Sequence, residues 1–362
     1  MDPITLQGNP NQMLRELLRQ SNLPVDGKKA RLITRLIGNS ILAEKKINSE
    51  KVLVLSYDDR HNWGKLFLEE MKEIKGVNCS LFNTADEVPD AENVFVYIHP
   101  DHTINRESDR IIIEALQNHT KTTFMPTLKE LFLYDEKIGQ SKEYASWLPK
   151  TWFFTDFDCA YRQISLMDFP FISKSNEGAA SSNIRFIPDK RNAELELKTV
   201  FSEKGLPRHD NRKIGLVQQG YVLWQEFLPN NNNDWRVIMM NKKYAWVLKR
   251  HNRPNVPFAS GSGNIEQIRK LNPMIEDILN FTLDFVNEFD YNFTGVDIVI
   301  NKDGEYKLLE TTTGWASPGY TECKVFIRNE TGEWAPSIFK GKDQWLIAAL
   351  SMDCLIKQKM DN

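Results

Sequence analysis

Apolar residues between positions 50 and 125 form short continuous runs that alternate with amphipathic stretches. KVLVLSY and NVFVYIH have the composition of buried strands, and Trp63 to Ile74 and RESDRIIIEALQNH have the spacing of helices. Strands that alternate with helices are typical of a parallel sheet. We therefore expect residues 50–125 to form a small α/β domain. No GxGxxG follows its first strand, so the pattern does not indicate a dinucleotide site.

From residue 126 to 362 the chain mixes alternating strands with loops rich in Gly, Ser and Asn. NDWRVIMM and KYAWVLKR predict two strands around a turn at residues 241–243. Asp234 and Arg236 alternate onto one face of the first of these strands. The bulky segment Val222 to Leu228 predicts an interdomain strand whose backbone would recognise the edge of a base in an apolar slot.

A hairpin is predicted where the runs Val296–Ile300 and Tyr306–Leu309 flank Asp303-Gly304, a pair typical of a two-residue turn. With that turn at the centre, Asp297 lies directly opposite Glu310. Like charges in such a position destabilise a hairpin unless a cation or a raised pKa compensates. A divalent metal such as Mg²⁺ is one explanation, and two solvated acids on an edge hairpin are the other.

Lys174 ends the predicted strand FPFISK and precedes a loop of small residues, Gly178 to Ser182. Small side chains let backbone N–H groups approach a phosphate, and a lysine at the base of the loop supplies a positive charge. The order differs from the Walker GxxxxGK[ST], in which the lysine follows the glycines. A solvated lysine at the end of a strand is the alternative interpretation.

Residues 10–42 predict two short helices around a turn at SNLPVDG, with locally reversed charge. Lys28, Arg31 and Arg35 share one face of the second helix, where they would meet successive phosphates or form a solvated basic face. The stretch LRELLRQSNLPVDGKKARLITRL resembles the SAP module, a small helix-turn-helix-like DNA-binding unit, although Asn22 stands where that module usually has Gly. The resemblance implies DNA binding by residues 1–45 through Lys28, Lys29, Arg31 and Arg35.

Composition indicates an ordinary globular protein with two or three domains, because 362 residues exceed a usual single core. Hydrophobic residues make up 41% and charged residues 26%, and the net charge of -3 does not by itself demand nucleic acid. No apolar run is long enough to span a membrane, and the N-terminus lacks the apolar region of a signal peptide. We therefore expect a cytoplasmic protein with no membrane partner.

Cysteine and histidine positions do not indicate a metal site. Cys79, Cys159, Cys323 and Cys354 are far apart and form no CxxC pair, so we expect reduced thiols. His99 and His102 form an HxxH, but Pro100 and Asp101 lie between them, and we expect a solvated loop there.

Taken in order, the elements of residues 50–350 resemble the ATP-grasp superfamily of carboxylate–amine ligases, and are most similar to its RimK-like and glutathione-synthetase-like branch. The matching elements are the α/β domain, DEKIGQ with Lys137, FPFISK with Lys174, the small-residue loop, WQEFLP, DWR, ASGSG and GVDI…LLE. The resemblance implies a mixed α/β and α+β fold. That fold would comprise a helical SAP-like module (1–45), a pre-ATP-grasp α/β domain (50–125) and an ATP-grasp domain (126–362) with a hinge near 222–229.

The resemblance also implies the roles of individual residues. ATP would be bound by Lys137, Lys174, Gly178, Ser181, Gln225, Glu226, Phe227, Leu228 and Asp234. Mg²⁺ would be bound by Asp297, Glu310 and Thr312, the last standing where the family usually has Asn. The catalytic candidates are Arg236, Lys249, Arg250 and Ser262, with Gly261 and Gly263 allowing their loop to close.

The reaction implied is the phosphorylation of a carboxylate by ATP, followed by attack of an amine from an amino acid or peptide to form an amide. Residues 1–45 would bring this activity to a macromolecular or DNA-associated target. Two alternatives stay open: an ATP-grasp kinase that phosphorylates a hydroxyl, and a non-catalytic DNA-binding scaffold, which the Thr312 departure allows.

Overall fold

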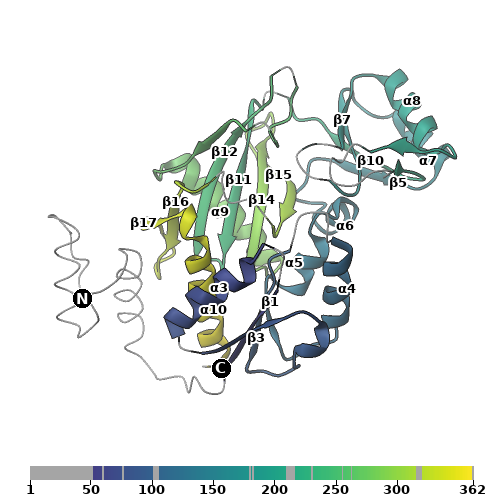
Figure 1. The fold of residues 1–362 in the computed structure, drawn as a ribbon. Helices are drawn as coiled ribbons and strands as arrows, with labels where there is room; N and C mark the ends of the chain where they lie inside the picture. The colour runs from purple at the N-terminus through teal and green to yellow at the C-terminus, as the bar shows by residue number, and fades with distance from the viewer. Residues whose placement is uncertain are drawn as a thin grey trace.

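The structure is a computed structural model (Figure 1). It describes residues 52–58, 61–75, 77–100, 106–178, 181, 183–208, 217–229, 231–254, 256–261, 263–314 and 320–360. The SAP-like module with Lys28, Lys29, Arg31 and Arg35 lies outside the described residues, as do Ser262 and His102. DNA binding by residues 1–45 therefore stays a prediction, and so does the division of the chain into domains.

A parallel four-stranded sheet of order β2-β1-β3-β4 forms the N-terminal part of the described chain, as predicted. Its strands β2 and β4 were not predicted, because NCSLF is half polar and TFM is only three residues long. The elements are β1 (Leu53–Tyr57), α3 (Trp63–Lys75), β2 (Asn78–Phe82), η2 (Ala85–Glu87), β3 (Val94–Tyr97), α4 (Arg106–Leu116) and β4 (Thr123–Met125).

An antiparallel four-stranded sheet of order β5-β10-β6-β7 follows two short helices. Helices α7 and α8 pack on it around Trp224, which is fully buried. The elements are α5 (Leu128–Leu133), α6 (Lys137–Glu143), β5 (Thr151–Phe154), α7 (Phe157–Ile164), β6 (Phe171–Lys174), β7 (Ile184–Ile187), α8 (Lys190–Val200), β8 (Leu206–Pro207), β9 (Val217–Gln218) and β10 (Val222–Glu226). This sheet lies at one end of the molecule (Figure 1).

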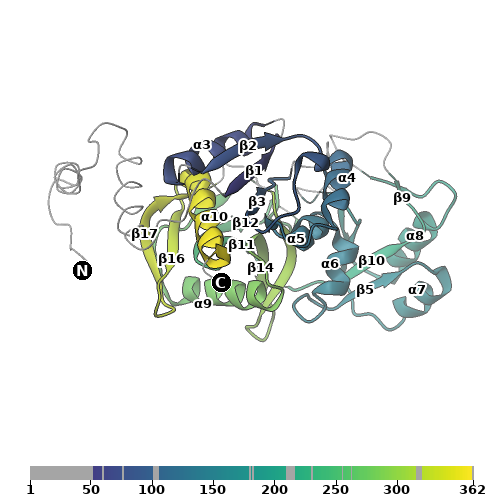
Figure 2. The ribbon, with the colours of Figure 1, turned by 90° about the horizontal axis from the view of Figure 1, so that it is seen from below.

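The largest sheet has the order β15-β14-β11-β12-β16-β17, with β13 paired to β12. Its elements are β11 (Asn233–Met240), β12 (Tyr244–His251), β13 (Ile265–Gln267), β14 (Phe293–Ile300), β15 (Tyr306–Thr312), β16 (Lys324–Arg328) and β17 (Trp334–Lys340). Two long helices, α9 (Pro273–Glu288) and α10 (Gln344–Met360), accompany it, and η4 (Gly341–Asp343) precedes α10. Figure 2 shows α9 on one side of this sheet and α3 on the other.

Side chains of β11 alternate between two hydrophobic cores. Val237 and Met239 pack with α9, whereas Ile238 and Met240 pack with α3, α10 and the parallel sheet. Because successive side chains point to opposite faces, Asp234 and Arg236 share the face of Ile238. Asp234 and Arg236 therefore lie on the face of β11 that points away from α9.

The β14–β15 hairpin pairs Asp297 with Glu310, as predicted, but its turn and its register near the turn differ from the prediction. The predicted two-residue turn is wrong: Asn301 and Glu305 close the loop, and Gly304 has a φ of +85° that suits glycine. Near the turn the register is therefore shifted by one residue, with Ile300 opposite Tyr306. A β-bulge at Leu309 shifts it back, so the two departures cancel.

Buried Glu130 joins helix α5 to the start of β14. Its carboxylate accepts hydrogen bonds from the backbone N–H groups of Thr127 (2.7 Å), Asn292 (3.2 Å) and Phe293 (2.9 Å). Burial raises the pKa of Glu130 to about 7, although these three N–H groups oppose the shift. One side chain therefore ties the end of the parallel-sheet region to the strand that carries Asp297.

The cysteines, His99 and the lengths of the helices bear on three further expectations. The four cysteines are free thiols, as predicted. His99 is buried against Trp63, whose ring centroid lies 4.5 Å away, so the prediction of a solvated loop is wrong for this residue. Among the helices that the structure describes, none is both long enough and apolar enough to cross a bilayer.

Replacing Glu130 with Gln is expected to lower the free energy of unfolding by about 1–3 kcal/mol, because an amide nitrogen cannot accept from buried N–H groups. Urea denaturation measures the change. Glu87→Gln is the matched control, since Glu87 closes the same kind of capping box with Thr84 but is exposed. Equal losses in the two variants would contradict the role given to Glu130.

Candidate functional site

A cleft separates the small antiparallel sheet from the large sheet. It is lined by residues of both sheets and by the connecting segments that carry Phe227, Leu228 and Ser260. Strands β6 and β10 line one side, and β11, β12, β14 and β15 line the other. Ten predicted site residues line it: Lys174, Ser181, Gln225, Glu226, Phe227, Leu228, Asp234, Arg250, Asp297 and Glu310.

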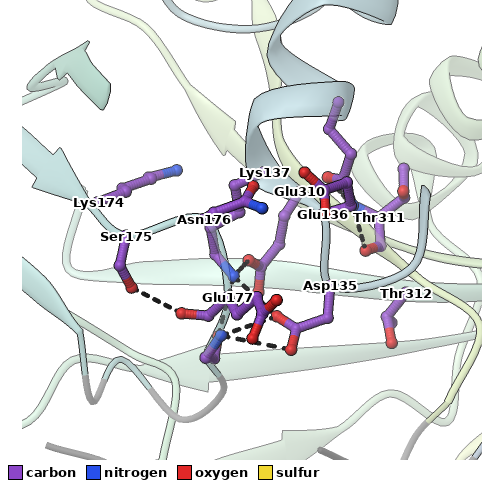
Figure 3. Close-up of polar contacts among 12 residues, drawn as sticks. Asp135, Glu136, Lys137, Lys174, Ser175, Asn176, Glu177, Glu310, Thr311 and Thr312 are labelled. Atoms are coloured by element: carbon purple, nitrogen blue, oxygen red, sulfur yellow. Dashed lines mark hydrogen bonds and ion pairs between the residues drawn. The ribbon is translucent and has the colours of Figure 1, made fainter. Parts of the chain in front are cut away.

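Two buried lysines reach the junction of the two sheets from different elements. Lys174 ends β6, and its Nζ donates to the Leu309 carbonyl at 3.4 Å. Lys137 begins α6, and its Nζ donates to the Gly178 carbonyl at 2.9 Å and to Asp135 at 3.1 Å. The same ammonium lies 3.5 Å from Glu310 Oε2. Figure 3 shows Lys137 and Glu310 meeting beside Asp135.

The two lysines differ in protonation because their neighbours differ. Burial lowers the pKa of Lys174 to about 8; Glu310 opposes this shift and Lys137 adds to it. Burial also lowers the pKa of Lys137, but Asp135 and Glu310 outweigh it and leave that pKa raised. Lys137 therefore stays charged, whereas Lys174 changes charge slightly above neutral pH.

A row of alternating charges crosses the large sheet beside the lysines. Asp234 lies directly opposite Arg250, and Arg236 lies directly opposite Asp297. Arg250 donates to both oxygens of Asp234 at 2.6 and 2.7 Å, and Arg236 donates to both oxygens of Asp297 at 2.6 and 2.8 Å. A further ion pair of 2.6 Å joins Arg250 to Asp297. The prediction that Asp234 and Arg236 share a face is confirmed.

Asp297 is consequently a different kind of carboxylate from Glu310. Burial tends to raise the pKa of Asp297, but Arg236 and Arg250 outweigh it and hold the pKa well below its usual range. The Asp297 side chain is only 3% exposed. The Glu310 side chain is 26% exposed, and its closest cation is Lys137 at 3.5 Å. The two acids face each other, yet only Glu310 has room for a further partner.

Of the three predicted magnesium ligands, Asp297 and Thr312 already bind other groups of the protein, and Glu310 is the most exposed. Both oxygens of Asp297 are bound by guanidinium groups, and the Thr312 hydroxyl donates to the Gly314 carbonyl at 2.5 Å. Within the described part of the chain, no cluster of three or more His, Cys, Asp or Glu side chains is suited to a metal ion. Mg²⁺ is commonly held by one or two carboxylates together with substrate phosphates. The side chains therefore fit a phosphate-bound Mg²⁺ through Glu310 and do not support Thr312 as a ligand.

The segment from Val222 to Leu228 leads from one sheet to the other. β10 is a central strand of the small sheet, between β5 and β6, and it ends at Glu226. Gln225 donates to the Thr151 hydroxyl at 3.0 Å, and Phe227 packs edge-to-face on Phe186 with ring centroids 5.2 Å apart. The bulky side chains thus hold this connection against the small sheet.

The loop of small residues is held at its base. Gly178 has a φ of +126°, and its N–H donates to Asp135 at 3.0 Å. A Cβ at this position would lie 2.6 Å from the Asn183 amide nitrogen, so the position requires glycine. Farther along, the Ser181 hydroxyl donates to the Ser260 carbonyl at 3.4 Å. The loop therefore touches the segment that carries Gly261 and Gly263.

Lys249 does not belong to the cleft. It lies opposite Trp235 in the register of β11 and β12, and its Nζ is 5.2 Å from the Trp235 ring. Trp235 belongs to the core formed with α9. Because neighbouring residues on a strand point to opposite faces, Lys249 points away from Arg250, and its predicted catalytic role is withdrawn.

Two residues of DEKIGQ, Asp135 and Gln140, belong to the site but were not predicted. Asp135 lies two residues before Lys137 and contacts both that lysine and Gly178, which proximity in sequence could have suggested. Gln140 pairs with the backbone of Thr311, 171 residues away. Sequence offers no signal for that contact, because it depends on how α6 packs against β15.

Comparisons with known proteins bear on the fold. No protein-family model and no curated protein matches this chain. The crystal structure of D-cycloserine synthetase DcsG has a TM-score of 0.51 and 13% identity, covering 85% of this chain and 99% of its own. ATP-grasp ligase PsnB, complexed with minimal precursor, Mg and ADP, has a TM-score of 0.49 and 13% identity, covering 85% and 100%.

A RimK domain ATP-grasp protein from Sphaerobacter thermophilus DSM 20745 has a TM-score of 0.45 and 13% identity, covering 73% of this chain and 92% of its own. At these identities a likeness concerns the fold alone, and the match to DcsG is the one that carries weight. Together with the three sheets described above, it agrees with the predicted architecture. The chain has the ATP-grasp fold.

Asp297→Asn is expected to lower the free energy of unfolding by about 3–5 kcal/mol, because it leaves two buried guanidinium groups without their shared carboxylate. Glu310→Gln is expected to change it by less than about 1 kcal/mol, since Glu310 is partly exposed and Lys137 keeps its ion pair with Asp135. Chemical denaturation of the two variants checks the contrast. A larger loss of stability for Glu310→Gln than for Asp297→Asn would contradict the structural role given to Asp297.

Proposed function

We propose that this chain is an ATP-dependent ligase that joins a carboxylate to an amine through an acyl phosphate, with release of ADP and phosphate. One observation carries the proposal: two buried lysines and a partly exposed glutamate meet at a cleft between two sheets of an ATP-grasp fold, with Lys174 and Glu310 in its lining and Lys137 beside them. Positive charge and an acid with room for a cation are what a Mg²⁺-bound polyphosphate requires.

The nucleotide would lie along the cleft with its phosphates toward the lysines. Lys137 and Lys174 would bind phosphate oxygens, and the loop at Gly178 and Ser181 would cover them. The base would lie toward the connection at residues 225–228, where apolar and backbone groups line the cleft. Asp234 has a different task, since both its oxygens hold Arg250.

Mg²⁺, when bound with the nucleotide, would neutralise charge on the phosphates during transfer. Glu310 is the residue proposed to hold it. Lys137, which contacts Glu310 in this structure, would exchange that contact for a phosphate oxygen. Positioning and electrostatics then account for most of the catalysis, because phosphoryl transfer needs little covalent participation by the protein.

In the first step an oxygen of the substrate carboxylate attacks the γ-phosphorus, and the bond from that phosphorus to the bridging oxygen of ADP breaks. In the second step the amine nitrogen attacks the acyl carbon, phosphate leaves with the carbon–oxygen bond electrons, and the nitrogen loses a proton. Arg236 and Arg250 are proposed to bind the carboxylate and the oxyanion. Their hydrogen bonds to the aspartates use Nε and one Nη, so each planar group keeps donors on its other edge.

Water must be kept from an acyl phosphate. The contact between Ser181 and Ser260 joins the two loops that border the cleft, and Gly261 and Gly263, with φ values of +75° and +71°, allow the second loop to move. Ser262 lies between these glycines, outside the described residues, and its catalytic role remains proposed. An amino acid or peptide is the proposed amine, and a DNA-associated target through residues 1–45 remains part of the same proposal.

Lys174→Ala and Glu310→Ala are each expected to reduce ATP turnover at least 100-fold, about 2.7 kcal/mol in activation free energy, while the fold stays intact. Turnover is measured as ADP and phosphate released in the presence of an amino-acid mixture with cell extract or genomic DNA, followed by a mass search for amide products. Lys249→Ala is the matched control, because Lys249 points to the opposite face of the sheet. AMP and pyrophosphate, or an amine-independent phosphorylated product, would contradict the ligase.

Nucleotide affinity is expected to fall as pH rises above about 8, the pKa of Lys174 in the free protein. A phosphate binds the protonated lysine, so above that pH binding must take up a proton and weakens by up to about tenfold per pH unit. Calorimetric titration with ADP and Mg²⁺ between pH 7 and 9.5 measures this. Lys174→Arg should remove most of the dependence, and an equally steep profile in that variant would contradict the assignment.

A further inference from the structure

Strand β15 is an edge strand, and backbone groups on its outer side make hydrogen bonds to other parts of the protein. It pairs with β14 on its inner side and ends the order of the large sheet. On the outer side the Leu308 N–H donates to the Trp147 carbonyl at 2.9 Å, and the Leu309 carbonyl accepts from Lys174. Edge strands with unpaired backbone groups are unstable and prone to wrong pairing. The cover over β15 therefore decides where this strand lies.

Gln140 supplies the next part of that cover. Its Oε1 accepts from the Thr311 N–H at 2.9 Å, and its Nε2 donates to the Thr311 carbonyl at 3.1 Å. The same Nε2 donates to the Leu133 carbonyl at 2.7 Å. The side chain is 2% exposed, so water does not compete for these bonds. Gln140 thus binds Thr311 as a neighbouring strand would.

Both ends of this contact lie next to residues of the proposed nucleotide site. Gln140 is one helical turn after Lys137 in α6, and residues three apart share a helix face. Thr311 directly follows Glu310 in β15. The amide therefore fixes the helix that begins with the lysine against the strand that carries the glutamate.

We propose that Gln140 is a positioning residue that sets the separation between the Lys137 ammonium and the Glu310 carboxylate. The inference rests on the proposed function, in which a Mg²⁺-bound phosphate enters between these two groups. Entry replaces their 3.5 Å ion pair, and the released side chains must then stay at the distance that phosphate and cation require. A misplacement of about 1 Å in such a site can cost about 100-fold in rate.

An amide is the group that this position needs. Methionine has a similar length but would leave the Thr311 N–H and carbonyl without these partners. Thr311 is only 7% exposed, so the loss would be costly. Glutamate keeps an acceptor for the N–H, but as a carboxylate it would face the carbonyls of Thr311 and Leu133. Only its protonated form supplies a donor, so Gln140→Glu should work better as pH falls.

The experiment compares ADP binding in excess Mg²⁺ by calorimetry, at a temperature well below the melting point of every variant. Gln140→Met is expected to weaken binding at least tenfold. Gln218→Met is the matched control, because Gln218 is fully buried in β9, which pairs with β8 outside the small sheet, and it accepts from Arg185 at 2.8 Å and donates to the Tyr221 carbonyl at 3.1 Å. It should lose a comparable amount of thermal stability and bind ADP within twofold of the wild type.

Gln140→Glu provides the second measurement, should Gln140→Met fail to fold. Its affinity relative to the wild type is expected to rise at least threefold from pH 8 to pH 6, because protonation restores the donor. Unchanged ADP binding in Gln140→Met, equal weakening in Gln218→Met, or a pH-independent gap in Gln140→Glu would each overturn the positioning role. If the wild type itself binds no ADP, the proposed function fails first, and this inference fails with it.

Discussion

The buried pairing of Asp297 with Arg236 and Arg250 is the interaction on which the site depends. Two guanidinium groups and two carboxylates lie in register across β12, β11 and β14. Each charge would be costly alone in this interior, so the row is stable only when all its members are present. The ion pairs therefore hold β12, β11 and β14 in register where the large sheet borders the cleft.

Because two arginines balance the charge of Asp297, the charged residues near the cleft are of two kinds: those held in tight ion pairs and those with longer contacts. Asp234 and Asp297 hold the arginines through hydrogen bonds of 2.6 to 2.8 Å, whereas Glu310 is partly exposed and lies 3.5 Å from Lys137, and Lys174 donates to the Leu309 carbonyl at 3.4 Å. In the proposed function, a cation and a phosphate replace the contact between Lys137 and Glu310 while the paired arginines stay in place. The distinction follows from contact distance and, for Glu310, from exposure, because the lysines are as buried as Arg250.

The second constraint is the contact between the two sheets. β15 lies at the edge of the large sheet, and its outward backbone groups are bonded by Lys174 from the small sheet and by Gln140 from helix α6. The glutamate and the lysines thus approach each other because an edge strand needs partners. The residues of the proposed polyphosphate site are therefore also the residues that bond the edge strand.

Sequence alone determined the alternation of strands and helices in the parallel-sheet region and the alternation that places Asp234 with Arg236, because period acts along a strand. It placed Asp297 opposite Glu310 only because the wrong turn and the bulge cancel. It did not determine the bulge at Leu309, the turn at Asn301 to Glu305 or the face of Lys249. Nor did it show that arginines saturate Asp297 or that Gln140 reaches Thr311. Those contacts join residues far apart in the chain, and only the packing of helices and sheets brings them together.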